Sequence, residues 1–397
     1  MTDTFKTDIA IIGGGISGLW LLNAFRQLGF KSVLLEKGEL GSMQTIASQG
    51  MIHGGIKYAL SGFTTPASEG IATMPEAWRS CLSGSGPIDL RSVNILSNDY
   101  YLFSDGSLSS KMTTFLGSKA IRSRISKVDR EQFPAPFSNR QFSGWLYRLQ
   151  DLVVETSSLL TNLQKLAGML TYQCDAQIVC KKPGQVHCLS LGDGLNLEAR
   201  LYVLAAGAGN ARLLHASGND TISMQQRPLH QVMVSSENLP AVFAHAVGLA
   251  SADKPRVTIT THHARNGRPV WYIGGNLAET GVDRSEGEQI DQARREMASL
   301  FPWIDFVDAK WATHRVDRAE PASQEHTRPD HPYYRLQQNL LVCWPTKLTL
   351  IPAMAKEICA ELPQWISPAV SNQREDLDLL EGLPIAEVSA APWETAF

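Results

Sequence analysis

Three glycines stand at a spacing that can hold the pyrophosphate of a dinucleotide. Gly13, Gly15 and Gly18 follow the apolar run of residues 9–12, and an amphipathic stretch over residues 19–28 comes after them. A glycine loop between a strand and a helix offers backbone N–H groups and the positive end of the helix to a phosphate. We expect the first glycine to make the turn, the second to admit the pyrophosphate and the third to pack the helix on the sheet.

An acidic residue completes this pattern. Glu36 ends the next apolar run, residues 32–35, where a carboxylate can accept the hydroxyls of an adenosine ribose. The same charge would repel a 2′-phosphate, so the pattern favours FAD or NAD over NADP. Ser17 can donate its hydroxyl to a phosphate oxygen. The alternative is a glycine-rich turn in an ordinary strand–helix unit, which requires three glycines and an acid to coincide.

The composition sets the class of protein. The chain has 397 residues, enough for two domains with substantial cores, and it carries a net charge of −3 with 43% hydrophobic residues. This charge gives no general attraction to nucleic acid. The six cysteines form no C-x-x-C pair and no zinc spacing, so we predict no metal site and a reducing, cytoplasmic setting. No apolar run reaches the roughly 20 residues that cross a membrane, and we expect no signal peptide.

Apolar periodicity predicts the elements that must position these residues. Pro183-Gly184 is expected to join two strands as a pair, and the tail after Leu362 is expected to be irregular. The small residues that end the strand over 201–209 predict a close approach to a ligand or to another backbone. The expected helices cover residues 19–28, 151–166, 289–300 and a stretch that begins near Pro352. The expected strands cover residues 7–12, 32–35, 171–179, 186–191, 201–209, 231–235, 256–261, 269–274 and 340–344.

Four blocks of the chain, taken in order, carry a family likeness. They are the glycine loop with Glu36-Lys37, residues 45–58 with His53-Gly54-Gly55, residues 204–209, and residues 348–352. Together they resemble the D-amino-acid-oxidase-type FAD-dependent oxidoreductases, which include glycine oxidase and sarcosine oxidase. The second block is most similar to a stretch of glycerol-3-phosphate dehydrogenase and L-2-hydroxyglutarate dehydrogenase. The turn at residues 345–347 departs from the family, because Pro-Thr-Lys stands where glycines are usual.

The resemblance implies the fold. We expect an α/β fold in which a Rossmann-type FAD-binding domain is interleaved with an α+β substrate domain on a mixed or antiparallel sheet. The expected FAD-binding domain comprises residues 1–80, 146–221 and 336–365. The expected substrate domain comprises residues 81–145 and 222–335, and residues 366–397 form a C-terminal tail.

The resemblance also implies where FAD binds. We expect FAD to be held without a covalent bond, because no cysteine stands in a recognisable flavin-attachment motif. The implied contacts are Gly13, Gly15, Ser17, Gly18, Glu36, Lys37, Thr45, Ser48, Gln49, Gly50, Ile178, Ala206, Gly207, Leu348 and Thr349.

The resemblance places two candidate catalytic residues beside the flavin ring. His53 is a candidate base, which takes the proton of a substrate amine or hydroxyl as hydride leaves for flavin N5. The alternative for His53 is a histidine that hydrogen-bonds the backbone and only positions the ring. Lys347 is a candidate cation near flavin N1 and C2=O, where it would stabilise the reduced flavin. The alternative for Lys347 is a surface lysine in a turn.

Other cations and aromatic residues are candidates for holding the substrate. Arg315 is similar to a family arginine near the substrate pocket, and its fork suits a carboxylate or a phosphate, so we place it with the catalytic candidates. Arg318 is expected to form a salt bridge with Asp317 or Glu320 instead. The substrate candidates are Lys57, Tyr58, His230 and Tyr272, and core packing is the default for the last two because strand residues alternate.

These inferences predict an FAD-dependent oxidoreductase that oxidises a small amine, amino acid or 2-hydroxy acid at its CH–NH or CH–OH carbon. Electrons would then pass to oxygen or to a carrier. An NAD-dependent dehydrogenase and a flavin-holding protein without turnover are the alternatives. The expected partner is a small-molecule substrate, with no nucleic acid and no transmembrane segment. The basic run from Lys111 to Arg130 allows a peripheral contact with acidic lipid, although a solvated face explains it more simply.

Overall fold

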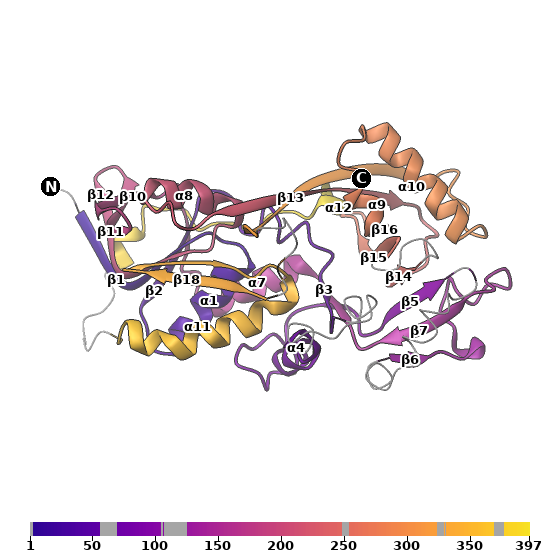
Figure 1. Cartoon of the computed structure of the whole chain (residues 1–397), viewed down its shortest axis with the longest axis horizontal. Coiled ribbons are helices and arrows are strands. Elements are labelled where there is room, and N and C mark those ends of the chain that lie inside the picture. The colour runs from indigo at the N-terminus through magenta and orange to yellow at the C-terminus, as the bar shows by residue number, and fades with distance from the viewer. Residues whose placement is uncertain are drawn as a thin grey trace.

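Two large sheets organise the molecule. The computed structural model describes residues 3–55, 70–104, 106, 125–247, 254–323, 329, 331–368 and 377–397. Figure 1 shows an elongated molecule with one sheet around β1 toward one end and the other sheet toward the opposite end. We call the sheet that contains β1 the first sheet and the sheet that contains β13 the second sheet. The long strand β13 begins beside the first sheet and runs into the second (Figure 1).

The first sheet has a parallel centre and antiparallel edges. Its order is β10-β11-β12-β1-β2-β9, with β19 beside β12 and β18 beside β19. β1 pairs in parallel with β12 and β2, and β12 pairs in parallel with β19. The bounds are β1 (Asp3–Ile12), β2 (Ser32–Glu36), β9 (Thr171–Gln173), β10 (Gln177–Lys182), β11 (Gln185–Gly192), β12 (Leu195–Leu204), β18 (Tyr333–Gln337) and β19 (Leu340–Trp344).

Alternate residues of the central strands build two cores. Ile9 and Ile11 pack with α1, α7 and α11, whereas Ala10 and Ile12 pack with residues of α8. Burial on both faces is typical of a parallel sheet, whose carboxyl ends meet at one edge. The loops that follow β1, β2, β12 and β19 therefore lie together. The bounds are α1 (Ile16–Gln27), α7 (Thr156–Leu166), α8 (Asn210–Ala216) and α11 (Ile351–Trp365).

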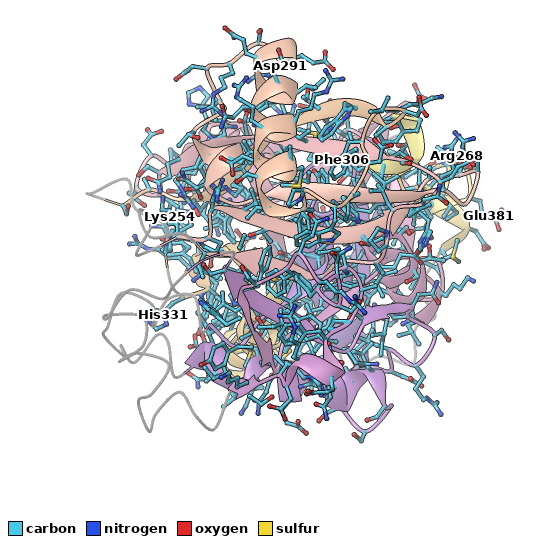
Figure 2. The ribbon with its side chains drawn as sticks, turned by 90° about the vertical axis from the view of Figure 1, so that its right-hand side faces the viewer. Lys254, Arg268, Asp291, Phe306, His331 and Glu381 are labelled. Carbon is cyan, nitrogen blue, oxygen red and sulfur yellow. The ribbon has the colours of Figure 1, made fainter. Side chains whose placement is uncertain are left out.

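The second sheet is antiparallel apart from one pair. Its order is β17-β13-β16-β15-β14-β5-β7-β6, and only β14 and β5 run parallel among these described strands. Helix α10 (Glu286–Leu300) starts at a Ser285 capping box and packs on this sheet. Figure 2 shows α10, which carries Asp291, at this end of the molecule. The bounds are β5 (Tyr100–Ser104), β6 (Ile125–Lys127), β7 (Trp145–Leu149), β13 (Met224–Ser235), β14 (Ala244–Ala246), β15 (Val257–His263), β16 (Pro269–Gly274) and β17 (Lys310–Pro321).

The chain passes between the two sheets more than once. It contributes strands to the first sheet within residues 3–36, 171–204 and 333–344, and to the second within residues 100–149 and 224–321. The predicted interleaved α/β fold is therefore confirmed. In the part of the chain that the structure describes, no helix has the length and apolar character needed to cross a membrane. The shorter elements are β3 (Met51–Ile52), β4 (Ile95–Ser97), β8 (Leu152–Val154), α4 (Met74–Leu82), α9 (Asn276–Glu279), α12 (Pro392–Thr395), η1 (Arg130–Gln132), η2 (Gly207–Gly209), η3 (Leu348–Leu350) and η4 (Leu377–Leu380).

Four predicted elements differ from the structure. The strand expected over 201–209 ends at Leu204, and η2 follows it over Gly207–Gly209. The helix expected over 151–166 begins at Thr156, because Val153 and Val154 favour a strand, and β8 pairs with β3 and β4. The strand expected over 171–179 is two strands: β9 pairs with β2, and only β10 forms the hairpin with β11. The tail is not irregular throughout, since it contains η4 and α12.

Candidate cofactor and substrate site

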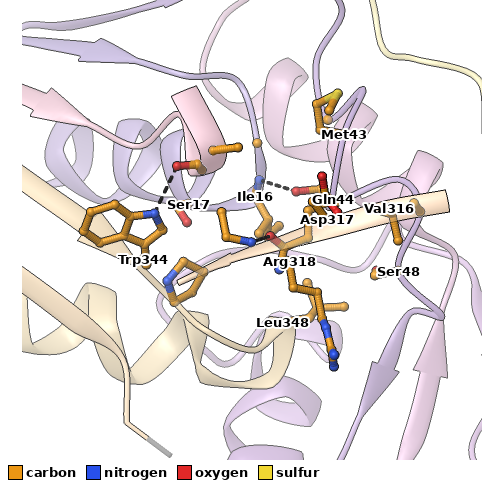
Figure 3. A pocket seen from close by; sticks show the side chains of 18 of the residues that line it. Ile16, Ser17, Met43, Gln44, Ser48, Val316, Asp317, Arg318, Trp344 and Leu348 are labelled. Atoms are coloured by element: carbon orange, nitrogen blue, oxygen red, sulfur yellow. Dashed lines mark hydrogen bonds between the residues drawn. The ribbon is translucent and has the colours of Figure 1, made fainter. Parts of the chain in front are cut away.

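A cavity of about 940 Å³ runs from the carboxyl edge of the first sheet to β13 and β17 of the second. Ligands of α/β proteins bind at this edge of a parallel sheet. The volume lies near the upper end of the roughly 300–1,000 Å³ usual for ligand pockets, so it suits an extended cofactor together with a small molecule. Figure 3 shows that α1, β17 and the turn after β19 all contribute side chains to this space.

The glycine loop has the form that its pattern predicts. Gly13 has a φ of +114°, which residues with a side chain rarely adopt, and a Cβ there would lie 2.5 Å from the backbone of Ala206. A Cβ at Gly18 would lie 2.0 Å from the carbonyl oxygen of Gly13, so this residue packs α1 on β1 rather than lining the cavity. Gly15 and Ser17 do line the cavity.

The N-terminus of α1 is suited to an anion. Gly15 stands at the N-cap and supplies no side-chain hydrogen bond, and the first turn of the helix has no acidic residue. The first N–H groups of a helix need acceptors from outside it, and the helix dipole favours negative charge there. This end of the helix faces the cavity, so its donors fit a pyrophosphate.

Glu36 is held at the end of β2 with its carboxylate against the cavity. It accepts hydrogen bonds from the backbone N–H groups of Gly14 at 2.6 Å and Gly38 at 3.0 Å. A carboxylate has about four acceptor positions, so these two bonds leave capacity for ribose hydroxyls. Lys37 lines the cavity beside it.

Ile178 lies away from the predicted position. It sits on β10 and packs against the apolar core of the first sheet, and it does not line the cavity. In this part of the chain the cavity is lined by Cys174, Asp175 and Ala176 instead. They follow β9 directly, and β9 ends at the carboxyl edge because it pairs in parallel with β2. The contact implied by the resemblance therefore lies a few residues too late in the chain.

The loop after β2 brings several predicted residues to the cavity. Thr45, Ser48, Gln49 and Gly50 all line it. The Thr45 hydroxyl accepts a hydrogen bond from the N–H of Ile16 at 3.2 Å, which ties this loop to the start of α1. The Gln49 amide donates to backbone oxygens of the second sheet. Ala206 and Gly207, which follow β12, line the same cavity.

His53 lies at the end of this loop, buried and in the cavity wall. Its backbone oxygen accepts a hydrogen bond from the Thr349 hydroxyl at 3.1 Å. The carbonyl of Thr349 in turn accepts from the indole of Trp78 at 3.1 Å. Thr349 was predicted to contact the cofactor, but it does not line the cavity. It fixes the backbone that carries His53 instead.

The turn after β19 presents a buried cation to the cavity. Lys347 is only 3% exposed and lines the cavity together with Leu348, so the alternative of a surface lysine is wrong. Trp344 fixes the start of this turn, because its indole N–H donates to the carbonyl of Gly207 at 3.0 Å (Figure 3). Between them, Thr346 has a φ of +61°, an outlier for a β-branched residue. Backbone strain of this kind is concentrated at functional sites.

This strain gives a prediction. Replacing Thr346 by glycine is expected to give a protein that unfolds at a higher temperature than the alanine variant. Both changes remove the hydroxyl that donates to the His331 carbonyl, so they differ only in backbone preference. At ordinary positions the order is reversed, with alanine more stable by about 0.5–1 kcal/mol. Thermal unfolding of the two variants side by side decides this, and an alanine variant as stable as the glycine variant would show that the turn is unstrained.

Two predicted substrate residues face away from the cavity. Arg315 and His230 are paired neighbours on β17 and β13. Arg315 donates to the carbonyls of Val282 and Arg284 at 2.6 and 2.5 Å, and His230 Nδ1 lies 2.9 Å from the carbonyl of Gly281. Both side chains therefore bind the loop over residues 281–284. The neighbours of His230, Leu229 and Gln231, line the cavity instead, as alternation along a strand requires.

Tyr272 also lies outside the cavity wall. It is fully buried, and its hydroxyl donates to the carbonyl of Ala47 at 3.1 Å and to the side-chain oxygen of Gln231. Burial raises the pKa of Tyr272, so the hydroxyl stays protonated and acts as a donor. Its structural role is to hold the loop after β2. Lys57 and Tyr58 lie outside the described residues.

A group of charged residues from β13, β17, α9 and the loop before β15 lies at the cavity, which Arg315 does not reach. Arg318 is 3.4 Å from Glu279, which also accepts a hydrogen bond from Lys254 at 2.6 Å, and all three line the cavity. Arg227 lines it too and pairs with the buried Glu320. We call these five residues the charged cluster. The sequence interpretation gave Arg318 a partner in Asp317 or Glu320, whereas the structure pairs it with Glu279.

Positive neighbours control the ionisation of Glu279. Burial alone would raise its pKa, but the hydrogen bond from Lys254 and the charges of Arg318 and Arg227 outweigh burial and lower the pKa. Glu279 is therefore a carboxylate that balances the cluster. Lys254 and Glu279 were not predicted, because no motif surrounds them and they come from a loop and the short helix α9.

Comparisons with known proteins agree with this geometry. The family model described as FAD dependent oxidoreductase matches residues 8–361. A probable FAD-dependent oxidoreductase of Pseudomonas aeruginosa is 45% identical over 399 residues, which cover 100% of both chains. A crystal structure of an FAD dependent oxidoreductase from that organism has a TM-score of 0.84 and 39% identity, covering 99% of each chain. Glycine oxidase from Geobacillus kaustophilus shares the fold, with a TM-score of 0.65, 18% identity, and coverage of 92% of this chain and 97% of that chain.

Proposed function

Because the chain belongs to the family of FAD-dependent oxidoreductases, we propose that its substrate is a small amino acid or 2-hydroxy acid. Bound FAD supplies the two-electron oxidation of a C–H bond next to nitrogen or oxygen. The observation that carries the proposal is the charged cluster in the cavity wall. An arginine fork there suits a carboxylate, and Glu279 balances the charge when no substrate is present.

The residues at the two ends of the cavity fit the two halves of FAD. The start of α1 and the loop at Gly13 would hold the pyrophosphate, and Glu36 would take the ribose hydroxyls. The loop over residues 45–50 and the turn over residues 345–348 would hold the flavin ring. The domain limits of the sequence interpretation stay a proposal, in which residues 1–80, 146–221 and 336–365 bind FAD and residues 81–145 and 222–335 bind the substrate.

Two residues would act on the reacting groups. A neutral His53 would take the proton of the substrate amine or hydroxyl, and its burial in the cavity wall keeps that transfer out of bulk water. Lys347 would place a fixed positive charge where negative charge develops as the substrate is oxidised. Oxygen or a separate carrier would take the electrons. A cytoplasmic location is part of the proposal, supported by six cysteines that are all free thiols.

Anaerobic bleaching of the flavin tests this function. A panel of amino acids, N-methyl amines, 2-hydroxy acids and glycerol phosphate is mixed with the holoenzyme, and the visible flavin absorbance is followed. We expect an amino acid or a 2-hydroxy acid to bleach the flavin, and the matching amine or alcohol without its carboxylate to bleach it far more slowly. Equal bleaching by the acid and its decarboxylated analogue would contradict the carboxylate assignment.

The arginine pair on β17 gives a matched prediction. Replacing Arg318 by alanine is expected to raise the substrate concentration for half-maximal flavin reduction about 10- to 100-fold, the range for losing hydrogen bonds to a charged group. Replacing Arg315 by alanine removes only contacts to the 281–284 loop and is expected to change it little. Rapid-reaction measurements on both variants decide between them. A large effect at Arg315 with none at Arg318 would restore the assignment made from the sequence.

A further inference from the structure

The C-terminal residues connect the two sheets. Gln173 N–H donates to the Pro384 carbonyl at 2.7 Å, and the Ala386 N–H donates to the carbonyl of Thr171 at 2.8 Å, so the segment is fixed beside β9. The N–H of Leu40 donates to the carbonyl of Glu387 at 2.7 Å. Figure 1 shows the yellow chain passing from the first sheet to α12 beside the second. We call residues 384–397 the C-terminal strap.

The end of the strap is buried against the second sheet. Trp393 in α12 stacks on His262 of β15, with ring centroids 3.7 Å apart and planes inclined by 19°. It also meets Tyr272 of β16 edge-on at 5.2 Å. The Glu394 carboxylate accepts from the N–H of Ala391 at 3.0 Å and fixes the start of α12. The end of the strap therefore packs against His262 and Tyr272.

A short series of hydrogen bonds joins this stack to the cavity wall. His262 Nε2 lies 2.9 Å from the Thr260 hydroxyl, which accepts from the Gln49 amide at 3.3 Å. The same amide donates to the carbonyls of Thr258 at 3.1 Å and Tyr272 at 2.9 Å. Burial, with His263 nearby, lowers the pKa of His262 to about 3, so its ring stays neutral in the folded protein. The Tyr272 hydroxyl holds Ala47 in the same loop.

We propose that the C-terminal strap positions the 45–50 loop at the cofactor, with Trp393 acting through His262 and Tyr272 on Gln49 and Ala47. This inference rests on the proposed placement of the flavin ring at that loop. Trp393 and His262 are positioning residues, since neither lines the cavity. Without the tryptophan the stack on His262 is lost, and the loop has more room to shift away from the geometry that binds FAD.

The test compares two tryptophans in the full-length holoprotein. Trp393→Ala is expected to raise the dissociation constant for FAD about 2- to 10-fold, the range for losing an aromatic pair, and to shift the visible flavin band. Trp393→Phe keeps a ring over His262 and is expected to recover most of the loss. Trp303→Ala is the control, because Trp303 packs on Phe142 and Phe301 in the core of the second sheet. It is expected to lower the unfolding temperature without changing the flavin band.

A milder variant tests the route. Thr260→Val removes the hydroxyl between His262 and Gln49 while keeping the side-chain shape. Its effect on FAD affinity is expected to be less than additive with that of Trp393→Ala, since both act on the same loop. Fully additive effects would show that Trp393 does not act on Gln49 through His262 and Thr260. A flavin band of the Trp393→Ala variant that matches the band of the Trp303→Ala variant would overturn the inference.

Gln49→Ala separates this inference from the placement on which it rests. If Gln49→Ala alters FAD affinity and the flavin band while Trp393→Ala does not, the loop lies at the cofactor and only the strap inference fails. If Gln49→Ala leaves both unchanged, the placement of the flavin ring at this loop fails, and the inference fails with it.

Discussion

Replacing His53 by glutamine is expected to slow reduction of the flavin by substrate about 10²- to 10⁴-fold, the usual contribution of a general base. Glutamine keeps a polar side chain of similar reach but cannot accept a proton at neutral pH. The FAD content is expected to stay unchanged, because the Thr349 hydroxyl holds the backbone of His53 and the substitution leaves that bond in place. Single-turnover reduction at saturating substrate measures the rate of this step directly.

His230→Gln is the matched control for this variant. His230 is also a buried histidine, but its ring binds the Gly281 carbonyl outside the cavity. Its rate of flavin reduction is expected to match that of the unchanged protein. A normal rate in His53→Gln would contradict the role of His53 as the base. Loss of FAD in that variant would assign His53 to cofactor binding.

The second large effect is expected at Gly18. An alanine Cβ there would lie 2.0 Å from the Gly13 carbonyl oxygen, which is backbone, so α1 must move away from β1. Overpacking of this kind costs roughly 1–3 kcal/mol, and the pyrophosphate donors move with the helix. Because the displaced donors no longer meet the pyrophosphate, FAD affinity is expected to drop by about 10- to 100-fold. Equilibrium titration of the apoprotein with FAD measures this loss.

Gly287→Ala controls for the substitution itself. Gly287 lies in α10, and nothing stands within 4 Å of a Cβ there. Alanine is the better helix former, so this variant is expected to be slightly more stable and to bind FAD normally. Tight FAD binding by Gly18→Ala would mean that the glycine loop does not hold the cofactor.

The parts of the site that local pattern specifies could be predicted from the sequence. The glycine loop and Glu36 belong to one strand–helix–strand unit, whose spacing fixes how they meet. The burial of the strands over residues 9–12 and 340–344 could be predicted, because their residues are apolar throughout. The interleaving of the two sheets followed from the family resemblance and not from periodicity, because no local pattern says which distant strands pair.

The substrate side depended on register that a single sequence does not reveal. Arg315 and Arg318 both lie on β17, and the pairing of β17 with β13 decides which of them reaches the cavity. A change of register by one residue moves every side chain of a strand to the other face of the sheet. His230, for which core packing was the default, is buried outside the cavity on that same opposite face. The contact of Trp393 with His262 joins residues far apart in the chain, so no motif announces it.

A crystal structure of the protein with FAD bound would show where the cofactor lies relative to α1 and the 45–50 loop. We expect the pyrophosphate on the N–H groups at the start of α1, beside Gly15 and Ser17, and the flavin ring between the 45–50 loop and the turn at Lys347. An FAD whose pyrophosphate lies away from α1, or whose ring lies away from both Gln49 and Lys347, would contradict it.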